Sequence, residues 1–164
     1  MEKKPFQVGL IRVLTSDDPH FVDMHGQIIM DHFPGIQVES RCIPDQWEGI
    51  HSHELELIAV PKIVELAKTF QDKDMIIVSC ADDPGVAEHM SVTGGGETTV
   101  ALAGKYGEKI GLLGITDYAP RAYRKLPKDR LVAVEKPEGV NSTLDLMTDE
   151  GRKNCVACAR KIKD

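Results

Sequence analysis

The feature that most constrains the fold of this chain is an alternation of short apolar, β-branched runs with longer stretches of helical periodicity. Apolar runs bounded by turn residues are typical of strands, and apolar residues three or four apart are typical of helices. Strands that alternate with helices favour a parallel sheet with right-handed crossover connections. We therefore predict an α/β fold, with a parallel sheet and flanking helices.

The expected elements follow one another in a simple order. Strands are predicted at residues 6–14, 36–43, 75–80, 109–115 and 130–136, and helices at 20–33, 54–70, 118–126 and 142–162. A short segment is expected at 84–90, and the glycine cluster in SVTGGGETTVALAGKYG leads into a further helix. We place a domain boundary at this cluster, with a first, flavodoxin-like α/β domain at residues 1–93 and a second α/β domain at residues 94–164.

Length, charge and apolar content exclude several classes of protein. The chain has 164 residues, which suits one domain or one and a half, and its net charge of −6 disfavours nucleic acid as a partner. No apolar run approaches the ~20 residues that a bilayer span requires, so we expect no membrane association. The opening residues, MEKKPFQVGLIRVL, do not form a signal peptide, and we expect a cytoplasmic protein.

Four cysteines stand at positions 42, 80, 155 and 158. In a cytoplasmic protein such residues are more often free, catalytic or metal-binding than disulfide-bonded. Cys155 and Cys158 form a C-x-x-C inside a predicted helix, with no second C-x-x-C and no well-spaced histidine. We interpret them as two small residues on one helix, because zinc sites and thioredoxin-type motifs need a different setting.

Polar or small side chains follow three of the predicted strands. They are Thr15 and Ser16 after the first, Cys80 to Asp83 after the third, and Thr116 and Asp117 after the strand KIGLLGI. Because ligands of open α/β sheets bind outside the carboxyl ends of the strands, we expect these residues to form a pocket for a small polar molecule.

The stretch IIVSCADDPGV places Cys80 where a buried strand stops. Asp83 can act as the N-cap, and Pro84 as the first residue, of a following helical turn whose positive end would lower the pKa of the thiol. Asp82 and Asp83 would repel a thiolate, so the residues leave the direction of the shift open. On residue type alone, core packing of Cys80 is favoured over reactivity.

Three other features have weaker interpretations. TGGGETT lacks the lysine of a Walker A loop and the third glycine of a dinucleotide fingerprint, so a tight turn that approaches a carboxylate or urea-like group competes with nucleotide binding. Among the histidines, at 20, 25, 32, 51, 53 and 89, we expect His25 and His32 to share a solvated helix face. Trp47 is either a lid over the strand ends or a hydrophobic anchor, and we favour the anchor.

Several segments together resemble the aspartate/glutamate/hydantoin racemase superfamily, and in particular its hydantoin (allantoin) racemase branch. The matching segments are VGLIRVLTS, SRCIPDQWEGI, IIVSCADDPGV, VTGGGETTVALA and KIGLLGIT, and their order and spacing hold through EGVNSTLDLMTDEGRKN. The most specific of them is the Cys-x-x-Asp-Pro-Gly run that follows a buried strand.

This resemblance implies a cofactor-independent racemase or epimerase, which is an isomerase. In the family, two facing α/β domains each supply a cysteine; one thiolate removes the α-proton of a carbon acid and the opposite thiol returns another, without metal or cofactor. Cys80 matches the first catalytic acid/base. Ala81 and Asp82 match positions that cradle the substrate, and Thr15 and Thr116 match other pocket edges. The implied substrate is a small molecule such as a hydantoin, allantoin or an amino acid.

The chain departs from the family in two places. The family's second cysteine follows a later strand, beyond the helix that ends here at Asp164, and Cys155 and Cys158 lie on that preceding helix. The second domain is therefore incomplete relative to the family, and the segment between Gly85 and Gly94 is several residues shorter.

These departures leave several readings open. The chain is a truncated product, a partner supplies the second acid, or the protein is a non-catalytic α/β small-ligand-binding or interaction protein derived from this fold. An uncovered sheet edge and helix face also predict a homo-oligomer.

Overall fold

A computed structural model describes residues 4–87 and 92–163, so the expected segment 84–90 is covered only in part and His89 lies outside the described residues. The strands are β1 (Phe6–Arg12), β2 (Ile36–Cys42), β3 (Met75–Ser79), β4 (Val92–Gly94), β5 (Ile110–Leu113) and β6 (Leu131–Glu135). The helices are α1 (Pro19–His32), α2 (His53–Lys68), α3 (Gly95–Tyr106), α4 (Arg121–Arg124) and α5 (Asp149–Lys163), with a 3₁₀ turn, η1 (Asp145–Met147).

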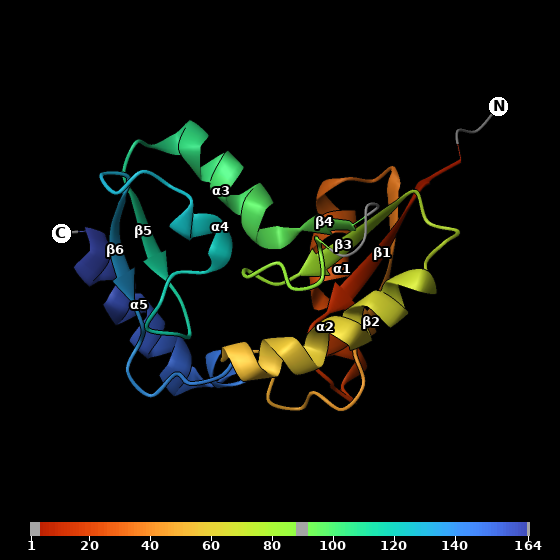
Figure 1. The fold of residues 1–164 in the computed structure, drawn as a ribbon, viewed down its shortest axis with the longest axis horizontal. Helices are drawn as coiled ribbons and strands as arrows, with labels where there is room; N and C mark the ends of the chain where they lie inside the picture. Colours follow the sequence, from red (N-terminus) through yellow and green to blue (C-terminus); the bar gives the residue numbers. More distant parts are fainter. Residues whose placement is uncertain (1–3, 88–91, 164) are drawn as a thin grey trace.

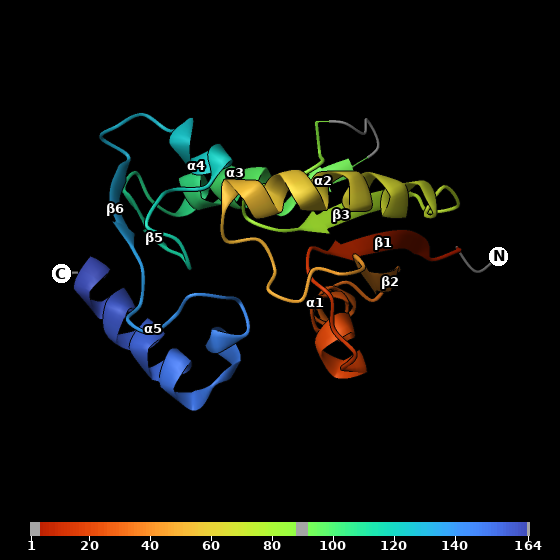
Figure 2. The same ribbon diagram turned by 60° about the horizontal axis from the view of Figure 1, so that its bottom comes forward.

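The predicted α/β class is confirmed by two parallel sheets. The larger has four strands in the order β2-β1-β3-β4, and the smaller pairs β5 with β6. Helices α1 and α2 cover opposite faces of the larger sheet (Figure 2). The short strand β4, which the sequence pattern did not predict, completes the larger sheet immediately before the glycine cluster.

Strand β1 lies at the centre of the larger sheet. From Val8 onward its apolar side chains are buried on both faces, as expected for a parallel strand with a helix layer on each side. Arg12, its last residue, lies opposite Cys42 of β2 and Ser79 of β3. Three polar or ionisable side chains therefore meet at the carboxyl edge of the sheet.

Helix α3 carries the chain from the larger sheet to the group formed by β5, β6, α4 and α5 (Figure 1). A second, smaller core forms there, and its buried members are Ile110, Leu112, Ala119, Ala122 and Tyr123. The chain thus forms two α/β halves, with the candidate site residues near the point where the halves face each other.

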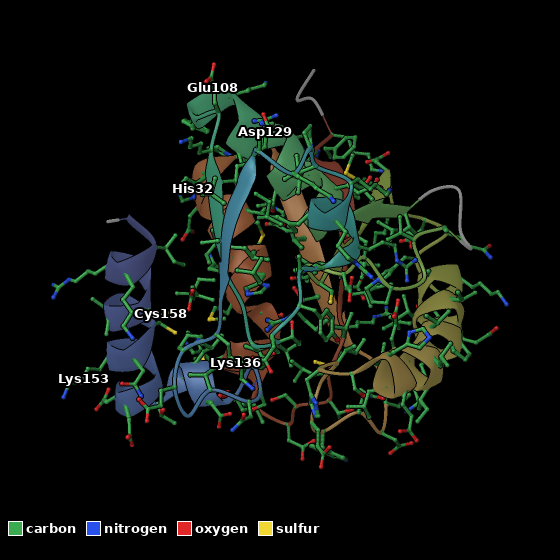
Figure 3. The ribbon with its side chains drawn as sticks, turned by 60° about the vertical axis from the view of Figure 1, so that its left-hand side comes forward. His32, Glu108, Asp129, Lys136, Lys153 and Cys158 are labelled. Atoms are coloured by element: carbon green, nitrogen blue, oxygen red, sulfur yellow. The ribbon has the colours of Figure 1, made fainter. Side chains whose placement is uncertain are left out.

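Helix α5 starts later than the predicted helix at 142–162. The carboxylate of Asp145 accepts hydrogen bonds from the backbone N–H groups of Asn141 and Ser142, both at 2.8 Å, which folds these residues into a turn. Cys155 and Cys158 lie on α5, as predicted. Figure 3 shows Cys158 on the side of α5 that faces β5 and β6, with Lys153 on the outer side.

Some apolar side chains of the second half are exposed, among them Val132 on β6 and Val156 on α5. The predicted homo-oligomer stays a prediction, because only the single chain is described. Among the described residues, none of the helices has the length and apolar character needed to cross a bilayer.

The packing of β1 against the end of α2 can be tested at Gly9, where a Cβ would lie 2.6 Å from Cγ of Phe70. We expect Gly9→Ala to lower the free energy of unfolding by about 1–3 kcal/mol, because the ring must shift in a filled core. Urea denaturation measures the change. Gly35→Ala is the control, since a Cβ there meets no atom within 4 Å. Equal losses in the two variants would contradict this packing.

Candidate functional site

A cavity of about 220 Å³ lies at the carboxyl ends of β1 and β3. Strand β1 has β2 on one side and β3 on the other, so the strand order reverses at this point of the sheet. Such a reversal opens a crevice in which α/β proteins bind ligands. Residues of both halves line the cavity, including Gly114, Thr116 and Tyr118 from the second half.

The structure brings together four of the five predicted site residues. Cys80, Ala81, Asp82 and Thr116 all line the cavity. Thr15 is not among the lining residues: its hydroxyl donates to the carbonyl oxygen of Ile43 and accepts from the backbone N–H of Gln46, both at 2.7 Å. Thr15 thus ties the end of β1 to the loop after β2, and its role as a substrate contact stays a prediction.

Asp83 controls the path of the loop that carries Cys80. It adopts a left-handed backbone conformation with φ of 52°, and its carboxylate accepts hydrogen bonds from the N–H groups of Gly96 and Glu97, both at 2.7 Å. We predicted that Asp83 caps a helix beginning at Pro84. This prediction is wrong, because residues 81–87 form turns and bends and not a helix. Asp83 instead caps α3, a helix that begins later in the sequence but nearby in space.

Gly94 and Gly96 of the glycine cluster stand where a side chain would collide with the Cys80 loop. A Cβ on Gly96 would lie 2.1 Å from the carbonyl oxygen of Ala81, and a Cβ on Gly94 would lie 2.2 Å from Cγ of Asp83. Only glycine lets α3 approach the Cys80 loop this closely. The cluster does approach a carboxylate, as one interpretation of the sequence held, but that carboxylate belongs to Asp83 of the same chain.

Asp82 and Arg121 join the two halves beside the cavity. The carboxylate of Asp82 accepts the backbone N–H of Arg121, on α4, at 2.6 Å. The guanidinium of Arg121 pairs with Glu56, a buried residue of α2. Because Asp82 directly follows the Cys80–Ala81 pair, these contacts set the position of the thiol loop relative to the second half.

The protonation state of Cys80 follows from its surroundings. Burial raises the pKa of the thiol to about 11, and the negative charges of Asp82, Asp83 and Glu56 act in the same direction, while a hydrogen bond from the Asp82 backbone acts against them. The sequence left this direction open, and in the structure desolvation is the largest effect. Cys80 is therefore a protonated thiol at neutral pH.

The cavity lining also includes residues that the sequence analysis did not assign to the site, among them Arg12, His25 and Ser79. Nδ1 of His25 lies 2.6 Å from Oγ of Ser79, and burial, followed by the charge of Arg12, lowers the pKa of the imidazole. The predicted solvated position of His25 is wrong, because α1 turns this residue toward the sheet. The one available signal was Arg12, a lone charge in the otherwise apolar run VGLIRVL.

A second hollow, of about 590 Å³, adjoins the cavity and shares Ile115, Thr116 and Tyr118 with it. Trp47 lines this outer hollow and is 53% exposed. The preference for a hydrophobic anchor is therefore wrong, because the side chain is not packed into a core. The indole stands at the rim of the route to the cavity, where it can contact a ligand or cover it.

No group of three or more histidine, cysteine, aspartate or glutamate side chains in residues 4–87 and 92–163 is arranged to hold a metal ion. All four cysteines lie within these residues and are free thiols.

The cap supplied by Asp83 can be tested by stability. We expect Asp83→Ala to lower the free energy of unfolding by about 1–3 kcal/mol, because two N–H groups of α3 lose their acceptor. Asp83→Asn keeps one acceptor oxygen and should lose less. The exposed Asp17→Ala serves as the control, and thermal unfolding of all three gives the comparison. A wild-type Tm for Asp83→Ala would contradict the cap.

The raised pKa of Cys80 can be tested by its rate of modification. A pKa of about 11 leaves about one thiol in 10⁴ ionised at pH 7, so the rate with methyl methanethiosulfonate should rise about tenfold per pH unit from pH 7 to 10. Peptide mass spectrometry follows the reaction, with Cys80→Ser to assign the peptide. A rate that levels off below pH 9 would mean that the thiolate is stabilised.

We compared the chain with protein-family models and with curated proteins. No protein-family model matches the chain, and no curated protein matches it. The resemblance to the racemase superfamily therefore rests on the sequence segments quoted above and stays a prediction.

Proposed function

We propose that this protein is a racemase-like isomerase that exchanges the α-proton of a small carbon acid at Cys80, without a cofactor. One observation carries the proposal: the Cys80 thiol lines a cavity between two α/β halves, at the reversal of strand order. Ala81 and Asp82 line the cavity from the same loop, and Thr116 lines it from the other half. A ligand in the cavity would thus contact the thiol and both halves at once.

The protonated state of Cys80 favours donation of a proton to the substrate over removal of a proton from it. A thiol can donate its proton to a carbanion that forms beside it, and general acid catalysis of this kind needs only contact with the reacting carbon. Action as a base needs the thiolate, which costs about 5 kcal/mol to form at pH 7 when the pKa is about 11. A bound ligand must supply this difference by displacing water and bringing polar groups to the sulfur.

Inversion of the carbon centre needs a second acid on the opposite face. Of the four cysteines, all in the described part of the chain, only Cys80 lines the cavity. Cys42 is the last residue of β2, and Cys155 and Cys158 lie on α5. The described chain therefore accounts for proton exchange on one face. A two-cysteine racemase reaction requires that a second copy or a further segment supply the other thiol.

The alternative is a non-catalytic protein that binds a small ligand in the same cavity. The raised pKa of Cys80 favours this alternative, because a thiol held neutral by burial also fits a packing role. Both functions use the same cavity, so they differ in proton exchange and not in binding.

Hydrogen–deuterium exchange separates the two functions. Each enantiomer of 5-methylhydantoin and of alanine is incubated with the protein in D₂O, and NMR follows the α-proton while optical rotation follows inversion. We expect exchange above the buffer rate, and a loss of about 10²–10⁴-fold in Cys80→Ala, as is typical when a general acid or base is removed. Cys42→Ser, outside the cavity, is the matched control and should keep the wild-type rate.

Each result has one meaning. Exchange with inversion supports a complete racemase, and exchange without inversion supports a single working face. Exchange that persists in Cys80→Ala would contradict the role of this thiol. No exchange in the folded wild-type protein would favour the binding function.

A further inference from the structure

Arg12 is a buried cation that lines the cavity. Its side chain is 2% exposed, and within the described part of the chain no carboxylate lies at ion-pair distance from its guanidinium. Arginine is almost never fully buried without a partner, because an uncompensated charge in the interior is costly. The position therefore calls for an anion that the described residues do not supply.

The contacts of Arg12 satisfy only part of the guanidinium. Nη1 donates to the carbonyl oxygen of Phe21 at 2.6 Å and lies 3.4 Å from that of Val22, and the group stacks over the Phe21 ring at 4.5 Å. Nε and Nη2 make no hydrogen bond to the described residues. No fully buried side-chain nitrogen or oxygen there lacks a partner, so these two nitrogens keep some accessible surface, and Arg12 is one of the residues that line the cavity.

Arg41 shows how the same fold treats a comparable residue with an internal partner. It lies on the neighbouring strand β2 and stacks over the ring of Phe70 at 4.7 Å. Its Nε and Nη2 both pair with the carboxylate of Glu39, and Arg41 does not line the cavity. The two stacked arginines thus differ in their partner and in burial, because the Arg41 side chain is 42% exposed and paired with Glu39, whereas Arg12 is 2% exposed and lines the cavity without a paired carboxylate among the described residues.

The nearest polar groups do not compete for this cation. Cys42 lies opposite Arg12 on β2, and burial raises the pKa of its thiol, which favours the neutral form. Ser79 lies opposite Arg12 in the strand register, and its hydroxyl is paired with the imidazole of His25, for which burial favours the neutral form. Asp82 also lines the cavity, but its carboxylate is held by the N–H of Arg121. The end of the cavity at Arg12 therefore combines one charge with neutral donors.

We propose that Arg12 forms a carboxylate subsite, so that the cavity takes a small open-chain carboxylate in preference to a neutral ring such as a hydantoin. The planar edge of a guanidinium, with two adjacent N–H groups, matches the two oxygens of a carboxylate. A cavity of about 220 Å³ equals the liquid volume of about seven water molecules, which suits a ligand of amino-acid size. The choice of substrate rests on the function proposed above, whereas the binding preference does not.

Matched pairs of ligands test the subsite. Isothermal titration calorimetry at pH 7.5 compares N-carbamoylalanine, N-acetylalanine and lactate with their carboxamides, and includes 5-methylhydantoin. We expect the carboxylates to bind the wild-type protein about 10- to 100-fold more tightly than the carboxamides, as for a hydrogen-bonded charged group. If no carboxylate of the panel binds more tightly than its amide, the proposal is overturned.

Two variants of Arg12 and one control variant of Arg41 assign the preference to Arg12. In Arg12→Met the carboxylate and its amide should bind within about twofold of each other, whereas Arg41→Met should keep the wild-type preference. Arg12→Lys retains a charge but not the planar edge, so it should reduce the preference while still favouring carboxylates, and it serves where Arg12→Met does not fold. An undiminished preference in a folded Arg12 variant would overturn the proposal.

The two proposals fail in distinguishable ways. Carboxylate preference without deuterium exchange supports the subsite and removes the isomerase function. Deuterium exchange on 5-methylhydantoin by a protein with no carboxylate preference supports the isomerase and removes the subsite.

Discussion

The hydrogen bonds from the first turn of α3 to the carboxylate of Asp83 are the contacts on which the candidate site depends. They hold the loop after β3 against a helix that belongs to the next part of the chain. Gly94 and Gly96 permit the approach, because any side chain there would collide with this loop. Since Cys80 to Asp82 belong to the same loop, the cap of α3 also sets where the thiol stands in the cavity.

The electrostatics of the cavity are divided between its two ends. Around Cys80, burial and the carboxylates of Asp82, Asp83 and Glu56 favour the neutral thiol. At Arg12, a charge remains buried beside neutral groups and without a carboxylate among the described residues. A ligand that brings its own negative charge to Arg12 and its carbon acid to Cys80 would match both ends. The two proposals therefore describe one binding mode, although they are tested separately.

Much of the fold could be predicted because hydrophobic period and turn residues are local properties. The predicted strands and helices are present. Cys80, Ala81 and Asp82 line the cavity from one loop after β3, whereas Thr116 follows β5 of the smaller sheet and reaches the same cavity because the two halves face each other. Short β4 and the late start of α5 could not be predicted, since the first depends on pairing with β3 and the second on a turn closed by Asp145. His25 and Trp47 were misjudged because helix rotation and loop path decide exposure, and neither is encoded in residue spacing.

The sequence by itself determined the α/β class, the place of Cys80 at a strand end and the start of a helix at the glycine cluster. These follow from periodicity and from residue types whose conformational limits are intrinsic. Only the tertiary structure decided the protonation of Cys80, the partner of Asp83 and the isolation of Arg12. The physical reason is that a pKa, a cap and an unpaired charge depend on desolvation and on neighbours distant in the chain, which come together only when the sheet and its helices pack.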